Sequence, residues 1–356
     1  MPKKREFLPV LQAIFAAVLF GTSAPLSKVL LGELDPIPLA GFLYLGSGLG
    51  AVIMLLVQRK RGQGSRVEAR LSRQDIPWLS GAIIAGGIIA PIFLLIGLRI
   101  TPASTASLLL NFETVATALI AVMIFKEAID KRIFWAIALI TLASILLSWS
   151  SEGWGFSPAA LLILVACFFW GLDNNFTRNI SSKDPLVIVS IKGLIAGSFS
   201  LILSLILGNS IPKLIVILLA LLLGAICYGL SIYLIILSMR HLGSTRAYAL
   251  FATAPFAGTL LSFFLLHDKP LWNFWPGMVI MIAGTWVMIS EHHAHDHTHE
   301  PLIHTHNHRH PDDHHDHVHQ PGEILIRGEH SHEHQHTSLD HVHKHTPDLH
   351  HRHSHN

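Results

Sequence analysis

The chain has 356 residues, of which 51% are hydrophobic and only 13% are charged. Soluble globular domains carry about 25% charged residues, so this composition excludes an ordinary soluble protein and indicates a protein of the lipid bilayer. The formal net charge of +2 is too small to predict nucleic acid as a partner.

The chain begins with three cations within its first five residues, and an apolar run starts near residue 9. A secretory signal begins in the same way, but this run exceeds 20 residues and no small-x-small cleavage site follows it. We therefore expect a first spanning helix, and nine more apolar segments follow that can each cross a core about 30 Å thick. The ten predicted spans are 9–31, 37–58, 77–99, 103–125, 132–149, 157–178, 185–207, 214–238, 245–266 and 271–290.

The loops predict the orientation of these spans. With the N-terminus inside, 16 Lys and Arg residues lie in or beside the inside segments and three in the outside loops. Such an excess of cations marks the cytoplasmic side. We expect a multi-pass protein of the cytoplasmic membrane with both termini in the cytoplasm.

Two stretches, Phe20–Lys28 and Trp170–Arg178, share a pattern of aromatic-Gly followed by a hydroxyl and a cation, 150 positions apart. A second match, at an offset of 141, aligns Glu113–Val115 with Ala254–Phe256 and Phe125–Glu127 with Leu266–Asp268. Five helices per half is an odd number, so the second half must cross the membrane inverted. Inverted repeats with a site at their interface are typical of secondary transporters. The predicted halves are 9–149 and 157–290.

Ten spans in two five-helix repeats, an aromatic-Gly followed by Lys or Arg in the first helix of each repeat, and the segment from Glu113 to Glu127 carry a family resemblance. In these features the chain resembles the EamA family of the drug/metabolite transporter superfamily, over about residues 10–290. It departs from the family pattern at Thr114, where a Pro is usual, although Pro255 keeps it in the second half. His267 and Asp268 replace the Gly-Glu often seen there. The resemblance implies a ten-helix permease that moves a small molecule, often outward, through a central cavity. It does not imply which molecule.

Ionisable residues inside spans are costly, about 2.5–3.5 kcal/mol at a helix centre on insertion scales. Glu113 lies near the midpoint of the fourth predicted span. It is either a cavity carboxylate that binds substrate or a proton, or part of an ion pair with Lys192 or Lys28 that only joins helices. Lys28 and Arg178 are the matched cations of the repeat, and both could also extend to lipid phosphates.

The sixth span carries a second polar group. A period of 3.6 residues puts Trp170, Asp173 and Thr177 on one face, with Asn174 and Arg178 beside it. This pattern predicts a cavity wall, and interhelical hydrogen bonding is the alternative. The candidate cavity residues are Glu113, Asp173, Asn174, Trp170, Thr177, Lys192 and Lys28. Others that could line a pocket, or serve only in packing, are Tyr44, Asn111, Tyr228 and Tyr248.

Enzyme chemistry has no support, because the chain lacks a P-loop, a dinucleotide fingerprint, a nucleophile elbow and an HExxH motif. Transport must then be driven by a gradient or a partner, and it requires no cofactor. Proton coupling through Glu113 or Asp173 is a hypothesis. The expected partners are the bilayer and a small solute or transition metal ion, and a homodimer stays open. Cys167 and Cys227 lie in apolar runs and predict buried thiols rather than a disulfide.

Residues 291–356 form a polar tail that holds 24 of the 26 histidines. It shows no apolar periodicity, so we expect it to be disordered. Imidazoles on a flexible chain suit Zn, Ni, Co or Cu, and a pH-sensitive polar tail is the alternative. The histidines that recur between the two halves of the tail are the candidate ligands: His297, His299, His304, His306, His308, His314, His315, His334, His336, His341, His343, His345, His350, His351 and His353.

Two functions follow from these features. The first is a secondary transporter of a small solute, most often an exporter in the family it resembles, with a tail that binds transition metal ions. Within this function, the tail favours a divalent metal or a metal-linked metabolite as the substrate, and an organic solute stays open. The second is a membrane-anchored metal-binding or storage protein without transport activity. An inverted repeat argues against a simple anchor, because one helix would be enough for that task.

Overall fold

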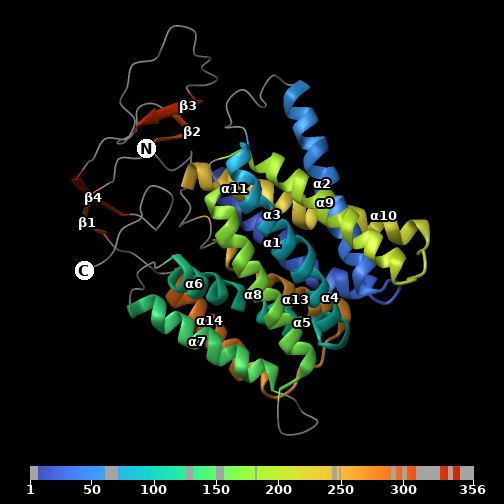
Figure 1. Cartoon of the computed structure of the whole chain (residues 1–356). Helices are drawn as coiled ribbons and strands as arrows, with labels where there is room; N and C mark the ends of the chain where they lie inside the picture. Colours follow the sequence, from blue (N-terminus) through green and yellow to red (C-terminus); the bar gives the residue numbers. More distant parts are fainter. Residues whose placement is uncertain are drawn as a thin grey trace.

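A computed structural model of the chain describes residues 7–60, 71–125, 131–149, 156–180, 183–242, 247 and 250–289, with the tail segments 294–298, 303–309, 329–335 and 340–344 (Figure 1). Within these residues, eight helical stretches are long and apolar enough to cross a membrane. Two shorter apolar helices, Ala254–Leu266 and Phe274–Met288, follow them. The predicted all-α membrane fold is confirmed.

The first half contains α1 (Phe7–Leu30), α2 (Pro36–Lys60), η1 (Arg73–Asp75), α3 (Ile76–Ala82), η2 (Ile83–Ile89), α4 (Ala90–Ile100), α5 (Ala103–Leu109), α6 (Phe112–Phe125) and α7 (Lys131–Ser148). The second half contains α8 (Pro158–Asn179), α9 (Pro185–Ile206), α10 (Leu214–Leu223), η3 (Gly224–Leu230), α11 (Ser231–Leu242), α13 (Ala254–Leu266) and α14 (Phe274–Ile289). The predicted spans agree with these helices, apart from the breaks described next.

The fourth predicted span is not continuous. The chain turns at Leu110 and Asn111, between α5 and α6, so Glu113 lies in the first turn of α6 rather than at mid-helix. The Thr114 hydroxyl donates to the Asn111 carbonyl at 2.7 Å, which gives this backbone group of the turn a hydrogen-bond partner. A hydropathy pattern could not show this break, because the apolar run continues through it. The ninth span breaks in the same way just before α13, whose first turn contains Pro255.

Matching irregularities confirm that the two halves are related. The segments η2 and η3 are π-helical and lie 141 positions apart, the offset that aligns Glu113 with Ala254. The starts of α6 and α13 correspond at nearly the same offset. Because π-helical turns are rare, their recurrence at one offset is strong evidence of duplication.

The helix pairing has the same symmetry (Figure 1). Helix α2 packs along α9, and α7 packs along α14, so each pair joins equivalent helices of the two halves. Helix α1 packs against α11 and α13, just as α8 packs against α4 and α6. Exchanging the halves therefore leaves the pairing unchanged, as the predicted inverted repeat requires.

Glycines permit the closest of these crossings. A β-carbon on Gly21 of α1 would lie 2.0 Å from the carbonyl oxygen of Ala254 in α13. A β-carbon on Gly171 of α8 would lie 2.9 Å from Ala116 in α6. These are the two glycines of the repeated aromatic-Gly motif, so the motif marks where the first helix of each half crosses a discontinuous helix. Close backbone approach at small residues is the usual way in which membrane helices associate.

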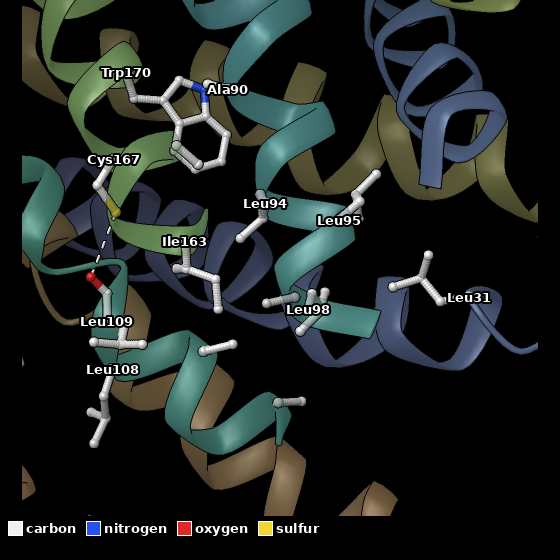
Figure 2. Packing of buried hydrophobic residues seen from close by; sticks show 14 of the residues in the cluster. Leu31, Ala90, Leu94, Leu95, Leu98, Leu108, Leu109, Ile163, Cys167 and Trp170 are labelled. Carbon is white, nitrogen blue, oxygen red and sulfur yellow. Dashed lines mark hydrogen bonds between the residues drawn. The ribbon is translucent and has the colours of Figure 1, made fainter. Parts of the chain in front are cut away.

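The main apolar core lies between α8, α4 and α5 (Figure 2). Ile163, Cys167 and Trp170 of α8 belong to the same buried cluster as Leu94 of α4 and Leu109 of α5. The Cys167 thiol donates to the Leu109 carbonyl at 3.6 Å, just before the break that ends α5. Cys167 and Cys227 are both buried and free. Since lipid chains are as apolar as these side chains, the core stabilises the fold mainly through van der Waals contact.

The tail contains four short strands, β1 (Ala294–Thr298), β2 (Ile303–Arg309), β3 (Glu329–Gln335) and β4 (Asp340–Lys344). Strand β1 pairs antiparallel with β4, and β2 pairs antiparallel with β3. The sequence predicts disorder for the whole tail, 291–356. Of this segment the structure describes the four strands, and the remaining tail residues lie outside the described part of the chain.

Candidate functional site

Asp173 of α8 and Lys192 of α9 form an ion pair inside the bundle. The Lys192 ammonium donates to Asp173 Oδ2, and the Thr177 hydroxyl donates to Oδ1 at 3.0 Å. The side chains of Asp173 and Lys192 are 7% and 18% exposed, respectively. Charges within membrane helices usually pair in this way and face the bundle interior. Lys192 therefore pairs with Asp173, and not with Glu113 as the sequence allowed.

The π-helical segment η2 packs against the Asp173 side of this ion pair. A β-carbon on Gly86 of η2 would lie 1.9 Å from Asp173 Oδ2, so only glycine fits against the carboxylate. The Gly86 carbonyl accepts hydrogen bonds from the Tyr44 hydroxyl and from Trp170 Nε1, the latter at 3.1 Å. A π-turn shifts the backbone hydrogen-bond register, and here two side chains bond its carbonyl. Tyr44 also lies beside Tyr228, with ring centroids 6.0 Å apart.

Glu113 belongs to a second polar group on α6 and α8. Asn174 Nδ2 donates to Glu113 Oε1 at 2.8 Å and to the Thr117 hydroxyl at 3.1 Å. The Thr117 hydroxyl in turn donates to the Glu113 carbonyl, and Asn175 donates to the Thr117 carbonyl at 3.1 Å. Asn174 is exposed and Glu113 is half-buried. This carboxylate therefore has a neutral amide, rather than a cation, as its hydrogen-bond partner in the described part of the chain.

Lys28 does not join either group, although the sequence predicts it as a cavity residue. Its ammonium donates to the carbonyls of Leu98, Arg99 and Thr101, at 2.6, 2.8 and 3.0 Å. A cation at these last carbonyls stabilises the C-terminus of α4, where the helix dipole is negative. Its counterpart Arg178 lies in the last turn of α8.

Comparison with known proteins identifies the family. The profile of the EamA-like transporter family matches residues 7–149 and 157–290. The chain belongs to the EamA-like transporter family. An uncharacterized transporter from Methanothermobacter thermautotrophicus (strain Delta H) is 28% identical over 305 residues, which cover 80% of this chain and 87% of that protein. A crystal structure of a protein described without a function shares the fold, with a TM-score of 0.57 at 19% identity over 78% of this chain and 94% of the other.

This EamA-family protein is therefore a multi-pass membrane transporter of a small solute, and not an enzyme. The structure brings together Asp173, Lys192, Thr177 and Trp170 in one group, and it brings Glu113 and Asn174 together in another. Residues of this site that the sequence does not single out are Gly86, Thr117 and Asn175. For Tyr44 the sequence leaves both pocket lining and packing open, and the structure places its hydroxyl on the Gly86 carbonyl. The Gly86-Gly87 pair was a visible signal, but its π-helical register was not.

The predicted metal ligands lie in the tail. The backbone is described for His297, His304, His306, His308, His334, His341 and His343. The other predicted ligands lie outside the described residues: His299, His314, His315, His336, His345, His350, His351 and His353. Tyr248, a candidate pocket residue, also lies outside them. Among the residues searched in the described part of the chain, no group of three or more His, Cys, Asp or Glu gathers in a way that could hold a metal ion.

Proposed function

We propose that this protein is a secondary transporter that exports a small polar solute across the cytoplasmic membrane, with both termini in the cytoplasm. The observation that carries the proposal is the presence of two polar groups within spanning helices, the Asp173–Lys192 ion pair and the Glu113–Asn174 hydrogen bond. Buried charge in a membrane is expensive and usually marks a solute or ion pathway. The excess of Lys and Arg in one set of loops supports the orientation.

Glu113 is the residue that we assign to proton coupling. Asp173 already has the Lys192 charge beside it, so gaining a proton would break that pair. Glu113 has the neutral amide of Asn174 as its partner, and the residue is only half-buried. It can therefore change charge without removing an ion pair, which is what a coupling carboxylate needs.

A metal-linked metabolite fits the site better than a bare metal ion. The carboxylates of the two polar groups have a lysine and an amide as partners, and no set of three metal ligands gathers in the described part. A transition metal held by protein alone requires about four such ligands. An organic solute that carries the metal needs only hydrogen bonds and one or two charges.

The tail is proposed to bind Zn, Ni, Co or Cu on the cytoplasmic side. The strand register supports this role, because His304 lies opposite His334, and His306 opposite His332. Alternate residues of a strand share a face, and directly opposed residues have β-carbons about 4.5–5.5 Å apart. Such spacing is compatible with two imidazoles on one ion.

One experiment separates transport from storage. Cells producing the full protein, the Glu113→Gln variant, or a form ending at residue 290 are compared for metal sensitivity and metal content. Transport predicts that Glu113→Gln abolishes the change in cellular metal, while Glu33→Gln, at an exposed loop position, leaves it intact. Storage by an anchored tail predicts that only the truncation matters. Metal content unaffected by every change would exclude a metal-linked solute.

A further inference from the structure

Helix α5 and the turns on either side of it carry a row of polar residues that the central site does not use. Ser104, Ser107 and Asn111 follow one another at helical spacing, and Thr101 precedes them at the end of α4. These residues are 0%, 1%, 3% and 6% exposed, respectively. In the described part of the chain, a side-chain polar atom of each lacks a hydrogen-bond partner. Buried polar groups are normally paired, so this concentration of exceptions requires an explanation.

The row lies at a junction between the two halves. The Thr259 hydroxyl of α13 donates to the Ser104 carbonyl at 3.2 Å. A β-carbon on Gly258 of α13 would lie 2.8 Å from Ser107 Oγ and 2.4 Å from the Gly21 carbonyl of α1. Helices α1, α5 and α13 thus close over hydroxyl groups that would be hydrated if the helices separated.

Two charged side chains form hydrogen bonds to backbone groups at one end of this junction. Lys28 of α1 binds the carbonyls of Leu98, Arg99 and Thr101, as described above. Asp268, just beyond α13, accepts a hydrogen bond from the Ser104 amide at 2.7 Å, at the start of α5. Both charges therefore hold the turn between α4 and α5 against helices α1 and α13.

We propose that the polar face of α5 is one half of the solute pathway in its closed state, and that Lys28 and Asp268 are its gate. The row leads from the gate to Asn111, two residues before Glu113. In the open state, water and solute satisfy the hydroxyl and amide groups that are unpartnered here. A lining of hydroxyls and an amide suits a polar solute that forms hydrogen bonds.

The repeat supplies a matched residue for the opposite gate. Arg178 stands 150 positions after Lys28, and α11 ends at Leu242, 141 positions after Thr101. Opening one end while the other closes is the motion that inverted repeats permit. Loss of Lys28 should therefore open only the α5 end, and loss of Arg178 should not open it.

Thiol labelling of purified protein in nanodiscs tests the gate. In a Cys167→Ala, Cys227→Ala background, Ser107→Cys reports the pathway, and Ala143→Cys, fully buried in α7, reports general loosening. Lys28→Met should raise the rate at which a charged thiol reagent labels Ser107→Cys by about tenfold, as expected for loss of hydrogen bonds to a charged group. The Ala143→Cys rate should not change, and Lys28→Arg, which retains the charge and donors, should remain slow.

Three results would overturn the proposal. They are an unchanged rate at Ser107→Cys, an equal rise at both reporters, and a rise produced equally by Arg178→Met. Asp268→Asn provides a second gate variant if Lys28→Met does not fold, and it should increase labelling at Ser107→Cys alone. The inference rests on the transport function, but the readout needs no solute. It therefore fails or succeeds independently of the proposed substrate.

Discussion

Asp173 and Lys192 show how a charge becomes tolerable inside a membrane bundle. The carboxylate has Lys192 on one oxygen, Thr177 on the other and the bare α-carbon of Gly86 beneath it. Neither charge has room for a full hydration shell. Each one is stabilised by the other, so the pair should behave as a unit when mutated.

Removing one member of this pair should destabilise the protein more than removing both. Lys192→Met leaves an uncompensated buried carboxylate and should cost about 3–5 kcal/mol of unfolding free energy. The double variant Asp173→Asn, Lys192→Met should recover most of that loss. Denaturant unfolding in detergent measures both values.

A matched control for this prediction is the exposed pair between Arg99 and Asp35, whose atoms lie 2.7 Å apart. These side chains are 53% and 43% exposed, so Arg99→Met should cost no more than about 1 kcal/mol. A double variant as unstable as Lys192→Met alone would show that Asp173 and Lys192 do not act as a unit.

Much of this site could be predicted from residue type and helical spacing. The face that carries Trp170, Asp173 and Thr177 follows from the 3.6-residue period, and mid-span charge marks Glu113 and Lys192. The choice of partners could not be predicted, because spacing along one helix contains no distance to another. Lys28 is the clearest case, since nothing local indicates that its ammonium would bind carbonyls 70 positions away.

At the scale of elements, apolar runs predict spans well and irregularities poorly. A break at Asn111 and a π-turn at Gly86 both lie inside continuous apolar sequence, so hydropathy passes over them. The repeat offset contains that information indirectly. Had the π-turn been known in one half, the offset of 141 would have located it in the other.

The two motif glycines give a prediction about helix crossing. In a helix interior, Ala is about 0.5–1 kcal/mol more favourable than Gly. At Gly21, however, the methyl group of Ala would overlap the carbonyl oxygen of Ala254. Overpacking of this kind costs about 1–3 kcal/mol, so the unfolding free energy should fall. Gly171→Ala should act in the same direction and more weakly, because its nearest atoms are 2.9 Å away.

The control for these variants is Gly32→Ala, at an exposed turn where the nearest atom is 3.3 Å away. It should change the unfolding free energy by less than about 0.5 kcal/mol, as is usual for surface substitutions. If Gly21→Ala were as stable as Gly32→Ala, the crossing of α1 and α13 would not depend on a missing side chain.

At the scale of the whole molecule, a symmetric scaffold carries asymmetric chemistry. At an offset of 150, Asp173 corresponds to Ser23, and the pair Asp35-Pro36 corresponds to Asp184-Pro185 at an offset of 149. By that second offset, Lys192 corresponds to Leu43. Only the second half therefore contributes the internal ion pair, although both halves contribute helix breaks and π-turns. Duplication explains the framework, and the sequence difference between the halves at these positions explains why the charged site is asymmetric.

The metal binding proposed for the tail gives the last prediction, which concerns its dependence on pH. A free imidazole titrates near 6.5 and binds metal only when neutral. Between pH 7.5 and 5.5 the neutral fraction falls about tenfold, so an ion held by two histidines should bind about 100-fold more weakly at the lower pH.

Calorimetric titration of the full-length protein with Zn or Ni at both pH values measures this change in affinity. A form ending at residue 290 is the control and should bind neither ion, because it lacks 24 of the 26 histidines. Equal affinity at both pH values, or equal affinity in the truncated form, would show that the histidines of the tail are not the ligands.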